Sequence, residues 1–479
     1  MSRRFTIRGG RVVTPAGVQR TDVHVSGERV LGLAARDADH ADDIDAEGCY
    51  VLPGGVDPHT HLLADVASAT RSAAFGGTTT AICFSNPRPG ESAPRALIRG
   101  RREVEKQAAI DVALHAIVGD PDRVTAGDLE RIRGLGVRGV KLFLAFPEQG
   151  LMASDGCLYE VMRAAPRLGL LVRVHCENGS VIQSLIADHL RQGRRRAAYF
   201  ARSRPPEVEE EAIARTLAIA GLAGAAVYIT HVTTAGGIRL IQTARANGRV
   251  AHAEVCVHHL VLDASRYRRK GAERFLVAPP LRPREHLEAL WSAAADGTVD
   301  TIGSDHAQSK YQPKAPSPRS GGRAGERSRG PILNAAIARW GGEHASRSPV
   351  DFTSLAYGLA GIELRLPLLL SEGLRRGLPI QRLVEIAATR PAQVFGLFPR
   401  KGGISPGADA DLVVWDPRPE WKVKASALHD GVGDSPYAGM TVRGAVRHVV
   451  LRGSPVVANG RWVGLASPGR YLSQANRGT

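Results

Sequence analysis

The residues of this chain best suited to chemistry are four histidines, one lysine and one aspartate, each close to the end of a short apolar run. Histidine nitrogens and aspartate oxygens are ligands that suit Zn²⁺ or a similar divalent ion. Four histidines and one aspartate are too many for one tetrahedral site that keeps a position open for water, so the set predicts two metal ions. The residues are His59 and His61 in P-H-T-H, Lys141 in G-V-K-L-F, His175 in V-H-C-E-N, His231 in Y-I-T-H-V and Asp305 in G-S-D-H.

Lys141 is the unusual member of this set, because an ammonium group with a pKa near ~10.4 has no lone pair for a cation. Carbamylation by CO₂ would turn its side chain into an anionic oxygen ligand that can bridge two ions. Each residue also has an ordinary interpretation, as a hydrogen-bonded histidine or as a partly buried lysine paired with a carboxylate. The H-x-H spacing favours metal binding, since a period of two puts His59 and His61 on one face of a strand.

Eight apolar runs along the chain have the length and composition of β-strands, and stretches with helical patterns, such as 207–223 and 284–295, lie between them. This alternation predicts βαβ units and a parallel sheet, and eight strands predict a (β/α)₈ barrel. In that fold the chemistry gathers at the carboxyl ends of the strands, where strands one, four, five, six and eight would carry the proposed ligands. The predicted strands are 55–61, 78–84, 110–118, 139–144, 170–175, 226–231, 249–256 and 299–304.

Both ends of the chain have a different pattern from the barrel. Near the start, F-T-I-R-G-G-R-V-V-T and T-D-V-H-V-S-G-E-R-V-L-G-L alternate apolar and polar residues, which is typical of hairpins with one buried face. Strand and turn residues return after the barrel, with Asn459 and Gly460 a strong hairpin pair. We therefore expect a small β-sandwich built from residues 1–52 and 396–465, a catalytic barrel over 53–395, and a tail over 466–479 that is mobile or reaches a neighbouring subunit.

Motifs along nearly the whole chain resemble those of the dihydropyrimidinase and hydantoinase family of cyclic amidohydrolases, within the amidohydrolase superfamily. They include L-P-G-G-V-D-P-H-T-H-L, G-V-K-L-F-L-A-F, S-R-P-P-E-V-E, A-P-P-L-R and S-P-G-A-D-A-D-L-V-V-W-D. The resemblance implies a binuclear zinc site with His59, His61 and Asp305 on one ion, His175 and His231 on the other, and carboxylated Lys141 between them. It also implies a homo-oligomer, as a dimer or tetramer, that opens a small cyclic amide or imide by attack of water.

The implied site suggests how the reaction runs. Two cations that share a hydroxide make a nucleophile available near neutral pH, because metal coordination lowers the pKa of water. Asp305 would accept the hydroxide's proton and pass it to the leaving ring nitrogen, as a general base and then a general acid.

The substrate side departs from the family pattern. Hydantoinases normally carry a tyrosine at the position of Phe146, and its phenol donates a hydrogen bond to the developing oxyanion, which phenylalanine cannot do. The serine that usually precedes P-P-L-R is Ala278, and the usual asparagine near the last barrel loops aligns loosely with Ser320. Losing one oxyanion donor typically costs about 10² to 10³ in turnover, so we expect either a substitute donor or an altered substrate.

Related activities remain as alternatives. Dihydroorotases place an arginine two positions after the second histidine, where it pairs with the substrate carboxylate, and this chain has Leu63 there. An apolar residue disfavours an anionic pyrimidine, and allantoinases match the S-R-P-P-E-V-E and A-P-P-L-R segments less well. Catalytically inactive scaffold members of the family have lost metal ligands that this chain keeps.

The composition agrees with a large barrel and a satellite domain, since the chain has 479 residues of which 43% are hydrophobic. Its five cysteines are odd in number and include no C-x-x-C pair, so we expect reduced thiols and a cytoplasmic enzyme. No apolar run long enough for a membrane span and no cleavable leader is present.

The formal net charge of +16 raises a rival hypothesis, a nucleic-acid-binding protein. The basic residues form two clusters, but no nucleic-acid motif accompanies them, and a solvated basic surface is the favoured interpretation. The role of four other polar residues near the motifs, Glu177, His258, His259 and His306, stays open at this stage. The clusters are Arg191, Arg194, Arg195, Arg196, Arg202 and Arg204, and Lys310, Lys314, Arg319, Arg323, Arg327 and Arg329.

Overall fold

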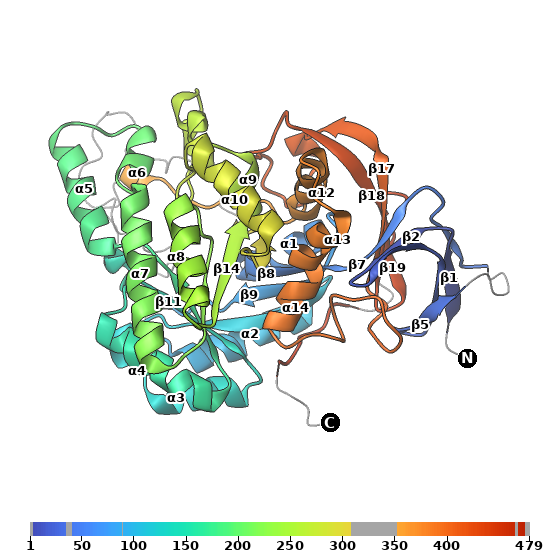
Figure 1. Cartoon of the computed structure of the whole chain (residues 1–479), viewed down its shortest axis with the longest axis horizontal. Coiled ribbons are helices and arrows are strands. Elements are labelled where there is room, and N and C mark those ends of the chain that lie inside the picture. The colour runs from blue at the N-terminus through green and yellow to red at the C-terminus, as the bar shows by residue number, and fades with distance from the viewer. Residues whose placement is uncertain (1–2, 35–40, 89, 308–351, 465–467, 475–479) are drawn as a thin grey trace, which may run out of the picture.

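The computed structural model describes residues 3–34, 41–88, 90–307, 352–464 and 468–474. It contains an α/β barrel and, beside it, a β-sandwich to which both ends of the chain contribute (Figure 1). No helix in this described part is long and apolar enough to span a membrane.

The barrel contains the eight predicted strands, and the (β/α)₈ prediction is confirmed. Neighbouring strands pair in parallel, and the eighth strand is split in two around Ser304 and Asp305. Its first part pairs with the seventh strand and its second part with the first, which closes the barrel. In sheet order the strands are β15 (Thr301–Gly303), β14 (Ala251–Cys256), β13 (Val227–Ile229), β12 (Leu171–His175), β11 (Gly139–Phe143), β10 (Asp111–Ile117), β9 (Thr78–Phe84), β8 (Gly55–His61) and β16 (His306–Ala307).

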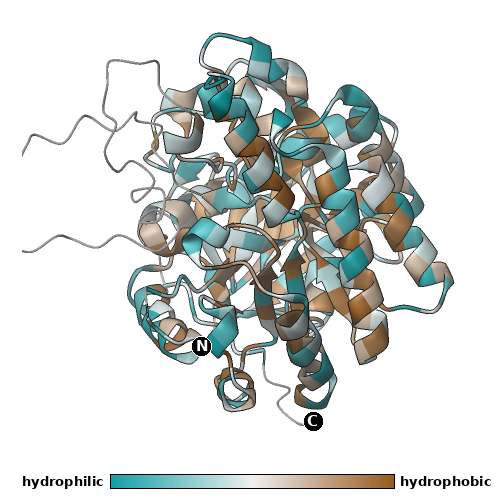
Figure 2. Cartoon of the chain, turned by 90° about the vertical axis from the view of Figure 1, so that its left-hand side faces the viewer, coloured by the Kyte–Doolittle hydropathy of each residue, from teal (hydrophilic) through white to brown (hydrophobic). Residues whose placement is uncertain are grey.

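Helices cover the outside of the barrel. In Figure 2 these helices carry both hydrophilic and hydrophobic residues, as expected of helices with one side against a core. The two predicted helical stretches appear as α7 (Pro206–Ala223), with proline in its first turn and Gly224 at a φ of 64° after its end, and α10 (Arg284–Asp296). Others include α1 (Val66–Phe75), α2 (Ala93–Gln107), α3 (Ala126–Gly134), α4 (Asp155–Leu168), α5 (Gly179–Arg191), α8 (Ala235–Ala246), α12 (Arg365–Arg375), α13 (Ile380–Val384) and α14 (Arg390–Val394).

The sandwich packs two sheets over an apolar core that includes Phe5, Val12, Val51, Leu412 and Val450. Its last hairpin turns at Asn459 and Gly460, both with positive φ, as the sequence predicts. One sheet has the order β5 (Arg29–Ala34), β4 (Asp22–Ser26), β1 (Arg4–Arg8) and β6 (Ile44–Asp45). The other has the order β20 (Arg461–Trp462), β19 (Ser454–Ala458), β18 (Thr441–Leu451), β17 (Leu412–Lys422), β7 (Tyr50–Pro53), β2 (Arg11–Thr14) and β3 (Gly17–Arg20).

A buried cluster of charges joins the sandwich to the amino-terminal end of the barrel. The Lys401 ammonium donates to Asp111, at the start of β10, at 2.6 Å and to Asp411, beside the sandwich, at 2.7 Å. Burial alone would lower the pKa of Lys401, but these carboxylates outweigh burial and raise its pKa. Arg452 also donates to Asp111. Breaking a buried ion pair is costly, so this cluster holds the sandwich and the barrel together.

Residues 468–474 do not form a mobile tail, because they lie against the barrel of their own chain. The backbone of Val112 in β10 exchanges hydrogen bonds with Arg470 and Leu472, and the side chains of Leu472 and Gln474 are buried. Gln474 also contacts the His115 ring at 3.1 Å. The polar composition of the segment gave no sign of these contacts, because they are made by the backbone and by the polar side chains of Arg470, Tyr471 and Gln474.

Candidate metal centre

The six residues proposed as metal ligands all face one pocket at the carboxyl end of the barrel. His59 and His61 end β8, Lys141 lies in β11 and His175 ends β12. His231 comes two residues after β13, and Asp305 occupies the break between β15 and β16. The residues that line the pocket are His59, His61, Lys141, Phe143, Phe146, His175, His231, Val277, Ala278, Asp305, Ala307, Tyr357 and Gly358.

Two histidines and the aspartate form the first group of donors. The Nε2 atoms of His59 and His61 lie 3.2 and 3.3 Å from Oδ1 of Asp305. Burial alone would raise the pKa of Asp305, but His59 and His61 outweigh burial and hold this pKa below its usual range. Two nitrogens and one carboxylate oxygen, all within 4.8 Å of one another, fit a divalent cation.

His175, His231 and Lys141 form the second group. Nδ1 of His175 lies 3.0 Å from Nε2 of His231. Lys141 donates from Nζ to Thr230 Oγ1 at 2.7 Å, and the same hydroxyl lies 3.2 Å from Nε2 of His231. Burial lowers the pKa of both histidines, which are therefore neutral and can offer a lone pair.

The backbone at the pocket is held in an uncommon conformation. His231, Asp305 and Phe146 have φ values of 38°, 46° and 64°, in the left-handed region that non-glycine residues rarely adopt. Such conformations cost roughly 1–3 kcal/mol each and persist where the surroundings over-determine them. Two of the proposed ligands and one wall residue are therefore placed at the expense of backbone stability, as is common at functional sites.

Glu254, in β14, is a buried carboxylate that supports the first group. It accepts hydrogen bonds from His59 Nδ1 at 2.5 Å and from the His231 backbone N–H at 3.1 Å. Arg173 and Tyr228 donate to its other oxygen at 2.9 and 2.7 Å. Metal-binding histidines usually donate their second nitrogen to such a group, and here the bond fixes the tautomer and leaves a lone pair on Nε2 of His59.

Glu177 supports the second group in the same way. It is fully buried and contacts Nε2 of His175 at 2.7 Å, so His175 presents Nδ1 to the pocket. Arg204 donates to the same carboxylate at 2.7 Å. Burial opposes ionisation of Glu177, but Arg204 and His175 together outweigh burial and lower its pKa. Arg204 therefore belongs to the inside of the barrel, although the sequence grouped it with a surface cluster.

The substrate side of the pocket is only partly as predicted. Phe146 and Ala278 line it, together with Val277 and Tyr357. Leu63 does not line this pocket: the chain leaves the strand after His61 and enters a 3₁₀ turn, and Leu63 packs on Gly100 of α2. Ser320 lies outside the described residues.

Tyr357 is a pocket residue that the sequence did not indicate. Its ring stacks on Phe146 with the ring centres 5.9 Å apart, and its hydroxyl accepts a hydrogen bond from Gln149 at 2.9 Å. Burial raises the pKa of Tyr357, so the phenol keeps its proton. Tyr357 lies in no helix or strand, and no pattern in the sequence marks it.

Three histidines whose roles stayed open also have definite positions. His306 accepts at Nδ1 from the backbone N–H groups of Gly361 and Ile362 and so braces a loop. His258 and His259 lie beside Cys256 in a separate cluster described below. Cys176 faces Thr216 of α7, away from the proposed ligands, as strand alternation predicts.

Strand-end donors around the mouth of a parallel barrel define the class of metal-dependent barrel hydrolases. A family model described as the amidohydrolase family matches residues 50–463. The chain belongs to the amidohydrolase family, and membership implies divalent metal ions.

Individual relatives confirm the predicted branch. The chain is 35% identical over 486 residues to a D-hydantoinase of Geobacillus stearothermophilus, with 98% of this chain and 97% of the relative covered. It is 33% identical over 480 residues to a D-hydantoinase of Ralstonia pickettii, with 98% of both covered. The crystal structure of a dihydropyrimidinase from Brevibacillus agri NCHU1002 is similar with a TM-score of 0.86 and 35% identity, over 98% of both chains.

We predict that Glu254→Gln lowers metal affinity about 10- to 100-fold, because a neutral amide orients His59 less strongly than a carboxylate does. Metal content after dialysis against a graded chelator measures this loss. The matched control is Glu209→Gln, since Glu209 is equally buried and pairs with Arg282 at 2.9 Å without touching a proposed ligand. Equal metal loss in both variants would contradict a specific role for Glu254.

Proposed function

We propose that this chain is a metal-dependent hydrolase that opens a cyclic amide or imide ring, as its hydantoinase and dihydropyrimidinase relatives do by name. The observation that carries the proposal is the convergence of six donor residues from five barrel strands on one pocket. In the reaction, water adds its hydroxyl to the ring carbonyl carbon, the C–N bond breaks and the nitrogen gains a proton.

Two divalent ions, most suitably Zn²⁺, would occupy the pocket. His59, His61 and Asp305 would hold one ion, and His175 and His231 the other, with carboxylated Lys141 between them. When bound, the ions would lower the pKa of a water molecule from about 16 to about 7 and polarise the carbonyl of the ring.

Carboxylation of Lys141 is supported by its surroundings. Burial and the nearby Arg173 lower the pKa of Lys141 to about 7. A neutral amine is the form that attacks CO₂, so a substantial fraction of Lys141 is reactive at neutral pH. The resulting carbamate would replace an ammonium, which repels cations, with an anion that attracts them.

Asp305 would transfer the proton. Its Oδ1 atom already contacts both His59 and His61, so Oδ2 is the oxygen that can exchange a proton with the substrate. The low pKa of Asp305 keeps the carboxylate ionised at neutral pH, which is the form that a general base requires. The same proton would then pass to the leaving nitrogen.

Tyr357 would replace the phenol that hydantoinases carry at the position of Phe146. Its oxygen accepts from Gln149, which leaves the phenolic proton for the substrate oxyanion. Phe146, Val277 and Ala278 add apolar walls. We therefore propose a less polar ring than dihydrouracil as the better substrate, such as a lactam, imide or cyclic urea.

Two further properties belong to the proposal. The enzyme would be cytoplasmic, supported by five cysteines that are all free and mostly buried. It would form a homo-oligomer, a dimer or tetramer. A small cyclic molecule is its proposed partner, and nucleic acid is not.

We predict that Lys141→Ala loses most bound metal and activity, and that short carboxylic acids restore part of both by replacing the carbamate. Carbon-13 NMR with labelled CO₂ should show a carbamate signal that disappears in this variant. The control is Lys106→Ala, because that lysine is exposed in the last turn of α2. A full complement of metal in Lys141→Ala would contradict the bridging role.

We predict that Asp305→Asn keeps appreciable metal and loses about 10² to 10⁴ in turnover, because an amide oxygen can still bind a cation but cannot carry the proton. Metal analysis and turnover measured on one preparation separate the two effects. Turnover equal to that of the unmodified enzyme would assign the proton transfer to another group.

The decisive test of the function is a panel of cyclic amides, imides, ureas and hydantoins offered to zinc-loaded protein with CO₂ present. We expect weak, broad activity on dihydrouracil and 5-substituted hydantoins, and a less polar ring as the best substrate, since apolar walls discriminate by only about 10- to 200-fold. Tyr357→Phe should reduce turnover about 10²- to 10³-fold.

Two results of that panel would contradict the account of the pocket. One is efficient dihydrouracil opening that Phe146→Tyr slows. The other is full turnover in Tyr357→Phe, which would remove the phenol from the reaction. No ring opened by the metal-loaded protein would contradict the proposed function itself.

A further inference from the structure

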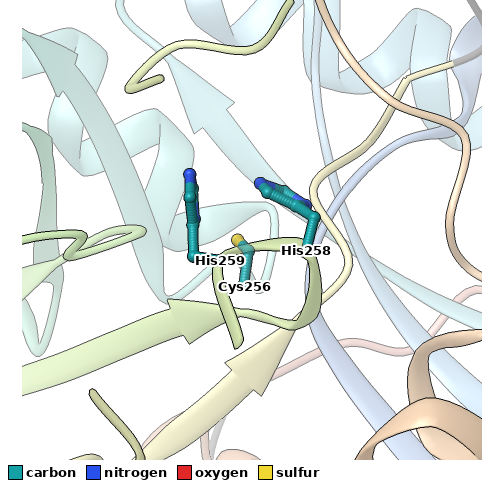
Figure 3. A group of neighbouring side chains, drawn as sticks. All are labelled: Cys256, His258 and His259. Carbon is teal, nitrogen blue, oxygen red and sulfur yellow. The ribbon is translucent and has the colours of Figure 1, made fainter. Parts of the chain in front are cut away.

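A second cluster of potential ligands lies outside the six residues described above. Cys256 ends β14, and His258 and His259 follow in the short helix α9 (Val257–Val261). Their donor atoms lie within 4.8 Å of one another, and the three side chains gather around one point (Figure 3). All three residues are buried, with 0%, 0% and 3% of their surface exposed.

The two imidazoles have nitrogens without partners. Nε2 of His259 donates to the carbonyl oxygen of Pro279 at 3.1 Å, so Nδ1 carries a lone pair, and Nδ1 has no hydrogen-bond partner among the described residues. His258 interacts with the Ser304 backbone through its ring, and its two nitrogens have no other hydrogen-bond partner among the described residues. Buried polar atoms left unpaired cost about 1–3 kcal/mol each.

This arrangement is the one that metal-binding histidines adopt. A ligating imidazole usually donates its other N–H to a carboxylate or to a backbone carbonyl, as His259 does to Pro279. A bound cation would use the lone pairs that the protein leaves unpaired. One sulfur and two imidazole nitrogens suit a soft d¹⁰ cation and not Mg²⁺ or Ca²⁺.

We propose that Cys256, His258 and His259 form a third metal site, which binds one Cu(I) ion. The Cys256 thiol releases its proton to solvent as the Cu–S bond forms, and the two imidazoles bind as neutral ligands. No electron is transferred, because copper enters and stays as Cu(I).

Charge favours Cu(I) over Zn²⁺ at this site. One thiolate and one Cu⁺ sum to zero, whereas Zn²⁺ would leave a net positive charge in a fully buried position, which is costly. The nearest carboxylate, Glu254, lies 3.9 Å from the Cys256 sulfur and already bonds to His59, Arg173 and Tyr228. Its negative charge is paired with the guanidinium of Arg173 at 2.9 Å, so the thiolate is the charge that balances a bound cation.

The site lies directly behind the wall of the catalytic pocket. Ala278 lines that pocket, and the carbonyl of the next residue, Pro279, is the partner of His259. Glu254 contacts both Cys256 and His59, so the third site and the candidate metal centre share a neighbour.

The test uses the full chain with its own metals, kept reduced under argon and titrated with Cu(I) against the chromophoric chelator bicinchoninate. We expect one equivalent of Cu(I) per chain to be held against the chelator, with X-ray absorption showing one sulfur and two nitrogen neighbours. Cys256→Ser should weaken binding about 100-fold or more, because the thiolate supplies the only ligand charge. The double variant His258→Gln, His259→Gln keeps the thiol and should also lose the ion.

The matched control is Cys157→Ser, since Cys157 is the cysteine that is not fully buried and would bind copper first if binding were adventitious. Copper retained by Cys256→Ser or by the double variant, or lost in Cys157→Ser, would overturn the proposal. So would a failure to bind Cu(I) at all, or a site that takes a third Zn²⁺ and rejects Cu(I). None of these outcomes depends on turnover of a cyclic amide.

Discussion

The buried ion pair of Glu254 and Arg173 is the interaction on which the catalytic end of the barrel depends. One Glu254 oxygen accepts from His59 and from the His231 backbone, and the other accepts from Arg173 and Tyr228. Arg173 in turn donates to the Pro58 carbonyl at 2.7 Å. A single charge pair therefore ties together strands β8, β12, β13 and β14 beneath the proposed ligands. An isolated charge at this depth would be prohibitively costly, so each member of the pair requires the other.

Much of the fold could be predicted from the sequence, because each barrel strand is a short apolar run and each proposed ligand follows such a run. Position at a strand end is a local property, and parallel strands bring their ends to the same face of a barrel. Prediction failed where local periodicity stopped. Leu63 follows the second histidine by two residues, but the strand has already ended in a 3₁₀ turn, so alternation no longer says where its side chain points.

The supporting residues could not be predicted, because nothing local distinguishes them. Glu254 is one of two polar residues in its strand, with His252, Glu177 resembles a turn residue, and Arg204 follows a run of arginines. Glu254 reaches His59 across 195 positions and Arg204 reaches Glu177 across 27, whereas Glu177 lies only two residues from His175. Tyr357 is a similar case, since only the folded chain brings it against Phe146. The proposed metal ligands can thus be predicted from the ends of strands, whereas the residues that face the substrate depend on loops.

The sandwich made from both ends of the chain imposes an order of events on biosynthesis. Strand β7 pairs with β17, in which Leu412 faces Pro53 and Val413 faces Leu52 across the two strands. The ribosome adds about 5–20 residues per second, so roughly 20–70 seconds pass between the synthesis of these partners. During that interval an apolar strand edge from the first 53 residues has no partner, while the barrel strands that follow it are being completed. The exposed edge of the amino-terminal strands must therefore be protected from aggregation until β17 has been synthesised. This makes these strands a natural substrate for chaperones.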